Sequence, residues 1–147
     1  MEAEKDPIRI LVLCTGNSCR SQIAQGFLKS FDKDLEVHSA GTFPASMVNP
    51  RAIKVMAEAG IDISMNKTRS VDKFLNDQWD YVITVCDEAN ETCPSFNGEV
   101  KHRLHLGFED PSNMKGSEDF ILSEFRRIRD EIDEEFRKFY NTNLKTK

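Results

Sequence analysis

Short apolar runs alternate with helical patterns along this chain, and that alternation constrains the fold more than any other feature of the sequence. The runs predict strands at residues 8–13, 35–40, 80–85 and 100–106, with the first and third almost continuously apolar. Helices are predicted over about residues 19–31, from Pro50 to just before Gly60 with Asn49 as the N-cap, and, more briefly, after Ser70. Strands that alternate with helices form parallel sheets with helices on both faces, so we expect an α/β fold.

The last helix gives the clearest pattern. Ser117 is the expected N-cap, and Glu118 and Asp119 occupy the first turn. Apolar residues then recur at four- and three-residue spacing along one face, at Ile121, Phe125, Ile128, Ile132, Phe136 and Phe139. This stripe predicts a helix that packs on the core.

Composition limits the class of protein. The chain has 147 residues, of which 39% are hydrophobic and 31% charged, which predicts one domain over residues 1–147. No apolar run approaches the roughly 20 residues that cross a bilayer, and the N-terminal segment lacks the pattern of a signal peptide, so we expect a cytoplasmic protein. A net charge of -5, with both signs interspersed, favours neither nucleic acid nor membrane as a partner. In a reducing compartment, four cysteines favour catalysis or metal binding over structural disulfides.

A loop between the first strand and the first helix has the composition of an oxyanion site. It follows Cys14 and contains Thr15, Gly16, Asn17, Ser18 and Cys19, before Arg20. Such a loop can turn successive N–H groups around a tetrahedral oxyanion, and Gly16 and Asn17 tolerate the backbone angles required. The Arg20 guanidinium matches two oxyanion oxygens at once. These surroundings predict a lowered pKa for Cys14, which we interpret as a nucleophile.

A second cysteine follows the third strand. If the strand order is 2-1-3-4, the first and third strands flank the point where the order reverses, and ligands of such folds bind there. The first strand leads into Cys14 and the third into Cys86. We therefore expect these two cysteines to lie close together at one binding site, at the carboxyl edge of the sheet.

The Cys-x5-Arg-Ser pattern, with Gly16, Asn17 and Cys19, resembles the low-molecular-weight tyrosine phosphatase superfamily. Within it, "CTGNSCRSQ", "VCDEANETC" and "GFEDP" resemble the thioredoxin-coupled arsenate reductase branch, and the likeness runs from Ile8 to about Phe139. It implies a three-layer sandwich with a four-stranded parallel sheet in the order 2-1-3-4.

The resemblance also implies roles for individual residues. Cys14 would be the nucleophile, Arg20 the oxyanion clamp and Ser21 a hydroxyl directed at the thiolate, with Asn17 supporting the loop. Asp110 lies where the superfamily carries its general acid, which would protonate the departing oxygen. An Asp-Pro turn is the plain alternative for Asp110, and Glu109 is a weaker candidate for the acid.

A relay of three cysteines follows from the same resemblance. Cys14 would bind arsenate covalently, Cys86 would attack Cys14 and release arsenite, and Cys93 would take over the disulfide for reduction by thioredoxin. Phosphate and sulfate would compete with arsenate, and no cofactor or resident metal is expected. If residues 86–93 were helical, the Cα atoms of Cys86 and Cys93 would lie about 10 Å apart. A disulfide spans no more than about 7 Å between Cα atoms. We therefore expect that segment to unwind or to be a mobile loop.

Two other functions stay open at this point. A low-molecular-weight tyrosine phosphatase would use Cys14, Arg20 and Asp110 without the further thiols, and phosphate-ester hydrolysis could also be a side activity of a reductase. A zinc module with four cysteine ligands is the second alternative, although the spacings C-x4-C and C-x6-C are loose for zinc. Cys19 is interpreted as a packing residue beneath the loop.

Overall fold

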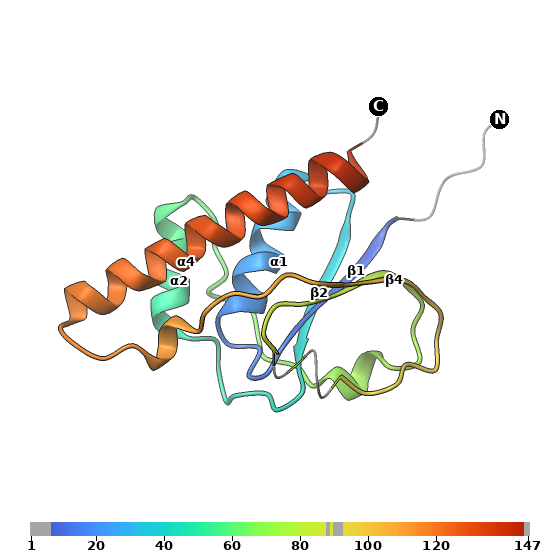
Figure 1. The fold of residues 1–147 in the computed structure, drawn as a ribbon, viewed down its shortest axis with the longest axis horizontal. Coiled ribbons are helices and arrows are strands. Elements are labelled where there is room, and N and C mark those ends of the chain that lie inside the picture. The colour runs from blue at the N-terminus through green and yellow to red at the C-terminus, as the bar shows by residue number, and fades with distance from the viewer. Residues whose placement is uncertain (1–6, 88, 90–92, 146–147) are drawn as a thin grey trace.

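The computed structural model describes residues 7–87, 89 and 93–145. The strands β1 (Arg9–Cys14), β2 (Glu36–Gly41), β3 (Trp79–Thr84) and β4 (Val100–His105) form one parallel sheet in the order β2-β1-β3-β4 (Figure 1). The predicted fold class and strand order are confirmed. Both ends of every predicted strand lie within one residue of the ends of an observed strand.

The main helices are α1 (Arg20–Phe31), α2 (Pro50–Glu58) and α4 (Glu118–Phe139), with short turns η1 (Val71–Phe74), η2 (Pro111–Asn113) and η3 (Tyr140–Leu144). Both expected caps are present. The side chain of Asn49 accepts a hydrogen bond from the N–H of Arg51 at 2.8 Å, and Ser117 accepts one from Phe120 at 3.1 Å. The helix expected after Ser70 is a single 3₁₀ turn.

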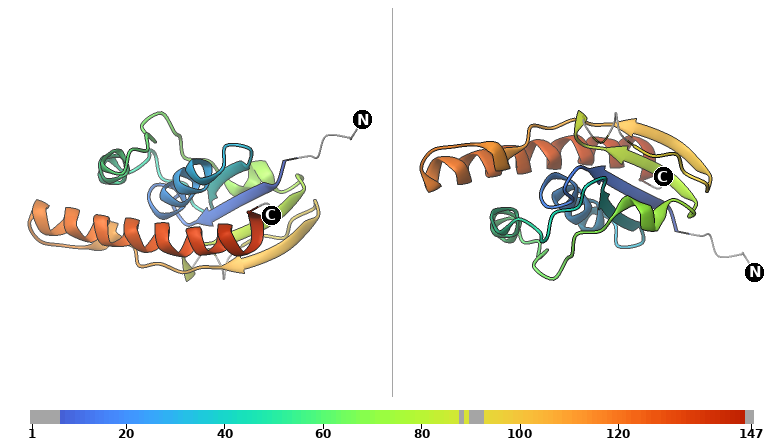
Figure 2. Two further views of the ribbon diagram at one scale, coloured as in Figure 1. Left: turned by 90° about the horizontal axis from the view of Figure 1, so that it is seen from above. Right: turned by 90° about the horizontal axis from the view of Figure 1, so that it is seen from below.

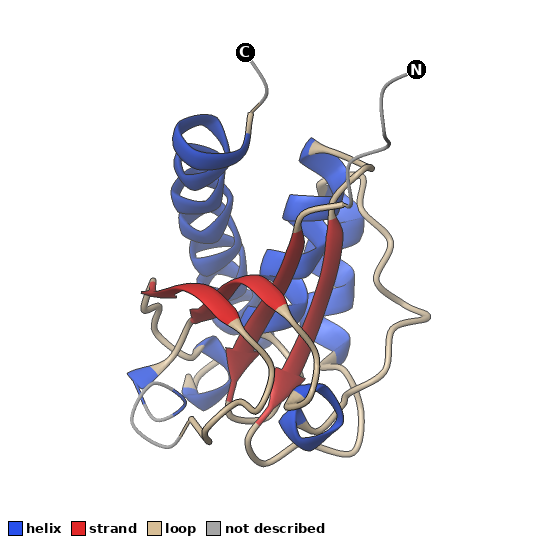
Figure 3. Ribbon diagram, turned by 90° about the vertical axis from the view of Figure 1, so that its right-hand side faces the viewer, coloured by secondary structure: helices blue, strands red, loops and turns tan. Residues whose placement is uncertain are grey.

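Two helices cover one face of the sheet. In Figure 3, α1 and α4 lie behind the four strands, and Figure 2 shows both helices on the same side of the sheet. On the other face, Phe74 of η1 packs against Trp79 and against His38, with ring centroids 5.7 and 5.5 Å apart. These three layers are the arrangement that the sequence predicts.

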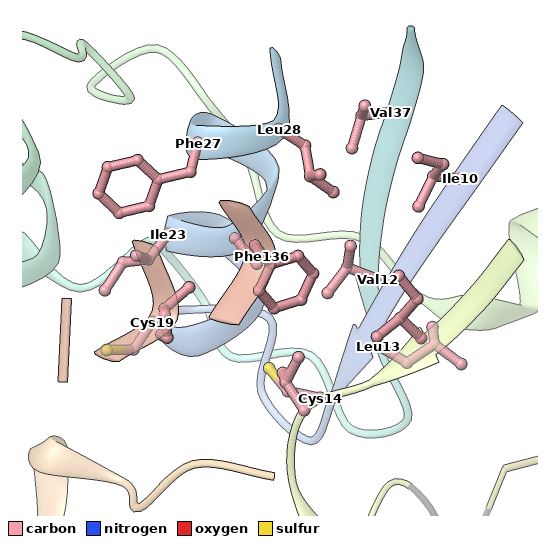
Figure 4. Packing of buried hydrophobic residues seen from close by; sticks show 14 of the residues in the cluster. Ile10, Val12, Leu13, Cys14, Cys19, Ile23, Phe27, Leu28, Val37 and Phe136 are labelled. Carbon is pink, nitrogen blue, oxygen red and sulfur yellow. The ribbon is translucent and has the colours of Figure 1, made fainter. Parts of the chain in front are cut away.

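The core lies between the helices and the sheet. Residues of α1, α4 and β1 form one buried cluster, which includes Ile23, Phe27, Phe136, Ile10 and Val12 (Figure 4). The buried residues of α4 are Leu122, Phe125, Ile128, Ile132, Phe136 and Phe139. The predicted stripe therefore holds from Phe125 onward, whereas in the first turn Leu122 is buried and Ile121 only partly so. Cys14 ends β1 at the edge of this cluster, so the fold fixes the position of its thiol.

Among the described residues, no helix combines the length and the apolar character needed to cross a membrane.

Candidate active site

The loop between β1 and α1 is held from outside by the segment that follows β2. Its carbonyl groups accept hydrogen bonds from that segment at Thr42 to Cys14, Phe43 to Thr15, Ala45 to Gly16 and Asn49 to Ser18, over 2.8 to 3.1 Å. Because these carbonyls point outward, the loop presents N–H groups on its inner side, as in other anion-binding nests. That side faces a cavity of about 200 Å³, which is lined by Cys14, Thr15, Gly16, Ser18, Cys19, Arg20 and Asp110.

Asn17 holds the loop in shape. Its φ of 53° lies in the left-handed region, which asparagine tolerates better than most residues. Its side-chain amide nitrogen donates to Ser21 Oγ at 2.8 Å and to Ser39 Oγ at 2.9 Å. Its amide oxygen accepts from the backbone N–H of Arg69 at 2.9 Å and from Gln22 Nε2 at 3.2 Å. Four partners thus fix one buried side chain at the centre of the loop.

Of the two glycines in this region, only Gly16 was singled out by the sequence. Gly16 does not use its conformational freedom, because the described glycines with a positive φ are Gly60 and Gly116. Gly41, at the end of β2, has the steric requirement instead. A Cβ atom at Gly41 would overlap the carbonyl oxygen of Thr15. Close contact between β2 and the loop therefore depends on Gly41.

The thiol of Cys14 is buried and hydrogen-bonded. Its Sγ lies 3.0 Å from Ser21 Oγ and accepts the N–H of Asn17 at 3.2 Å, and the residue is 2% exposed. Burial raises the pKa of Cys14, and the bonds to Ser21 and Asn17 together with the charge of Arg20 oppose that rise. The predicted lowering of this pKa is thus wrong for the free protein, because desolvation outweighs the groups that favour the thiolate.

Arg20 and Asp110 meet at the cavity. Arg20 Nη1 donates to the carbonyl oxygen of Phe108 at 3.0 Å, and Nη2 lies 3.4 Å from Asp110 Oδ2. The other oxygen of Asp110 accepts from the N–H and the hydroxyl of Ser112, at 2.9 and 2.6 Å, so Asp110 also caps η2. Glu109 pairs with Arg127 at 3.4 Å and does not line the cavity.

Cys86 lies against the loop that follows Cys14. Its Sγ is 3.3 Å from Thr15 Oγ1 and accepts the N–H of Ala89 at 3.4 Å, and the residue is 4% exposed. The preceding residue, Val85, accepts the N–H of Phe108 at 3.1 Å. The carboxyl ends of β1 and β3 therefore bring the segments of Cys14 and Cys86 together, as the strand order predicts.

Cys93 lies apart from the oxyanion cavity. It is partly buried in a separate cavity of about 320 Å³, whose lining includes Arg103 and His105. Burial raises the pKa of Cys93, and the charge and hydrogen bond of Arg103 oppose that rise. The expected unwinding between Cys86 and Cys93 falls largely on residues 88 and 90–92, which lie outside the described residues.

The remaining observations concern metals and Cys19. All four cysteines are free, and the described residues contain no group of three or more His, Cys, Asp or Glu side chains placed to hold a metal ion. The zinc alternative therefore has no support within that part of the chain. Cys19 is buried at the oxyanion cavity, and burial raises its pKa.

Sequence reasoning missed the residues that support Asn17. Gln22 and Ser39 are buried polar residues that bond to it directly, and the backbone of residues 67–69 completes its surroundings. Gln22 follows directly after Arg20 and Ser21, so its position in the motif was the available signal. Ser39 lies in a strand and Arg69 in a loop, where nothing in the sequence points to Asn17.

An oxyanion loop with a cysteine and an arginine, on a parallel sheet in the order 2-1-3-4, defines a cysteine-dependent phosphatase-like protein. A model of the family "Low molecular weight phosphotyrosine protein phosphatase" matches residues 9–147, and the chain belongs to that family.

Within that family, the chain is similar to proteins that bear a more particular name. An arsenate reductase of Halalkalibacterium halodurans is 43% identical over 134 residues, which are 90% of this chain and 95% of that protein. A solved arsenate reductase in the oxidised state superimposes with a TM-score of 0.77 at 29% identity, covering 91% of this chain and 97% of the other. A thioredoxin-dependent arsenate reductase of Corynebacterium glutamicum gives 0.70 at 27% identity, covering 95% of this chain and 63% of the other.

Proposed function

We propose that this chain reduces arsenate to arsenite and that an external thiol reductant, thioredoxin, restores it. The observation that carries the proposal is the position of Cys86, whose sulfur contacts Thr15 directly beside the nucleophilic cysteine. A phosphatase of this family needs no second thiol there. The names of the similar proteins support the same reaction.

In the first step, the Cys14 thiolate attacks arsenic, and an arsenic–sulfur bond replaces one arsenic–oxygen bond. Arg20 and the N–H groups of the loop hold the remaining oxygens, whose negative charge they stabilise. Asp110 donates a proton to the departing oxygen, which leaves as water. Asp110 lines the cavity and lies 3.4 Å from Arg20, so its carboxyl group stands beside the arginine that holds the anion.

In the second step, the thiolate of Cys86 attacks the sulfur of Cys14. A disulfide forms, the arsenic–sulfur bond breaks, and its electron pair stays on arsenic, which leaves as arsenite. Cys93 then attacks Cys86 and frees Cys14, so the disulfide moves to a cysteine outside the oxyanion cavity. Thioredoxin supplies the two electrons that reduce this disulfide, and a reductant of this kind supports a cytoplasmic location.

The same cavity can also support hydrolysis of phosphate monoesters. Cys14, Arg20 and Asp110 are sufficient for a phosphocysteine intermediate, and the phosphatase family model matches nearly the whole chain. We regard this as a side activity of the reduced protein, since it leaves Cys86 and Cys93 without a task.

The decisive experiment measures arsenite formation from arsenate with thioredoxin, thioredoxin reductase and NADPH. We expect sustained turnover with all three components and none when thioredoxin is omitted. A parallel assay follows hydrolysis of an aryl phosphate by reduced protein. Rapid hydrolysis of the ester without arsenite formation would reject the reductase and leave the phosphatase.

A further inference from the structure

A further cavity, which we name the second cavity, lies beside the edge strand β2 and is separate from the oxyanion cavity and from the cavity at Cys93. Its volume is about 350 Å³, and it shares no lining residue with the oxyanion cavity. Its lining includes Gln25, Lys29, His38, Ser39, Lys67 and Arg69. It is therefore a separate space formed by α1, the edge strand β2 and the segment after α2.

Positively charged residues gather around this second cavity. Lys29, Lys67 and Arg69 form no ion pair with any residue that the structure describes, and no carboxylate lines the cavity. The nearby Glu36 is bound to His38 at 3.0 Å and to Arg9 at 2.8 Å. Three cations without an ion pair among the described residues surround one hollow, and together they favour an anionic ligand.

The cations extend from a segment whose backbone is fixed. The carbonyl of Lys67 accepts from Gln22 Nε2 at 3.2 Å, and the N–H of Arg69 donates to Asn17 Oδ1 at 2.9 Å. The carbonyl of Arg69 accepts from the N–H of Gly41 at 2.8 Å. Because the backbone is already ordered, a ligand needs to order only side chains, which lowers the entropic cost of binding.

From these observations we propose that the second cavity binds an anion that carries a diphosphate group. The cavity is larger than the one that faces Cys14, and its volume lies in the range of small-molecule sites, about 300 to 1,000 Å³. Cations on α1 and on the 67–69 segment suit more than one charged centre, and arginine can hold a phosphate through two hydrogen bonds. Met65, also in the lining, is 86% exposed and offers an apolar contact to an organic group.

Isothermal titration with inorganic pyrophosphate tests the site on the reduced full-length chain. The wild-type protein should bind two equivalents, one in each cavity, and the Lys67→Ala/Arg69→Ala variant should bind one. Arg20→Ala weakens binding in the oxyanion cavity. The binding that remains in this variant therefore reports the second cavity alone. Adding Lys67→Ala and Arg69→Ala to it should weaken this binding about tenfold or more, since two charge-assisted contacts are lost.

The control removes two exposed lysines elsewhere, Lys33→Ala/Lys54→Ala, and should leave both equivalents unchanged. A parallel titration with ADP identifies the source of the diphosphate: equal affinity indicates an inorganic ligand and tighter binding a nucleotide, and both support the site. Equal binding by wild type and Lys67→Ala/Arg69→Ala, whether of one equivalent or of two, would overturn the proposal. The wild-type comparison stands even if Arg20→Ala fails to fold.

Discussion

The side-chain amide of Asn17 donates a hydrogen bond to the hydroxyl oxygen of Ser21 across 2.8 Å. Because that oxygen acts as an acceptor, the single hydroxyl hydrogen of Ser21 is left for the sulfur of Cys14, 3.0 Å away. Asn17 thus determines which way the Ser21 hydroxyl points. The thiolate of Cys14 gains a donor that the neutral thiol does not need.

Ser21→Ala should make Cys14 less reactive. The bond from Ser21 lowers the pKa of Cys14 against the effect of burial, so its loss raises the pKa and reduces the thiolate fraction at a given pH. The alkylation rate of Cys14 should fall about tenfold, because a hydrogen bond to a charged group contributes about 1.5–3 kcal/mol. Mass spectrometry of the alkylated protein over a pH series measures this rate. An unchanged pH profile would remove Ser21 from this role.

Arg20→Lys should lose arsenate turnover while the protein stays folded. The planar guanidinium bonds to the Phe108 carbonyl and lies beside Asp110, and an ammonium group cannot reproduce that geometry. We expect turnover to fall about a hundredfold or more, as when an oxyanion donor is removed. Steady-state arsenite formation and thermal unfolding are measured on the same preparation. Wild-type kinetics in this variant would contradict the clamp.

Cys93→Ser should complete about one turnover and stop. Cys14 and Cys86 remain, so arsenite is released once and the protein is trapped as the Cys14–Cys86 disulfide. Cys86→Ser should release no arsenite when small thiols are absent. Quenched-reaction mass spectrometry identifies the trapped disulfide, and an arsenite assay counts the turnovers. Sustained thioredoxin-driven turnover by Cys93→Ser would exclude the three-cysteine relay.

Gly41→Ala should damage the active site far more than Gly16→Ala. A Cβ at Gly41 collides with the backbone of the oxyanion loop, whereas one at Gly16 has its nearest neighbour, Ser18 Oγ, at an ordinary 3.5 Å. Relieving the first collision displaces the loop, so phosphate binding should be lost and the thermal midpoint lowered. Titration with phosphate and thermal unfolding compare the two variants. Equal effects would show that the loop can shift away from β2 at little cost.

Glu58 should make the protein less stable in acid. The guanidinium groups of Arg126 and, second, Arg129 lower the pKa of Glu58 from 4.5 to about 2 in the folded state. A lowered folded pKa stabilises the protein above the unfolded pKa, and this contribution is lost as pH falls from about 4.5 toward 2. Urea unfolding of wild type and Glu58→Gln should therefore differ at neutral pH and converge in this window.

The matched control for Glu58 is Arg126→Gln. Arg126→Gln removes the main partner of Glu58. The difference in free energy of unfolding between Arg126→Gln and the double variant Glu58→Gln/Arg126→Gln should therefore depend less on pH. A constant difference between wild type and Glu58→Gln across the whole range would exclude the ion pair between α2 and α4 as its source.

Much of the fold could be predicted because its signals are local. The apolar runs, the caps at Asn49 and Ser117 and the stripe on α4 each follow from neighbouring residues, and the strand order followed from the family resemblance. At the start of α4 the prediction named Ile121, whereas Leu122 is the buried residue, because packing decides between two neighbours that both fit the apolar period.

The candidate site was predictable in its motif and not in its support. Cys14, Arg20 and Asp110 line one cavity, as the motifs imply. The partners of Asn17 come from β2 and from residues 67–69, and contacts over such separations leave no sequence pattern. The direction in which the pKa of Cys14 shifts also depends on burial, which only the packed structure reveals.

The depth at which Cys14 and Cys86 lie also protects the resting protein. Dissolved peroxides oxidise thiols according to their exposure and their thiolate fraction. Both residues are less than 5% exposed, and burial raises the pKa of Cys14, which disfavours its reactive thiolate form. Dissolved oxidants therefore react slowly with the sulfur atoms of Cys14 and Cys86. The protein can therefore persist in a cell that contains no arsenate and consume few reducing equivalents.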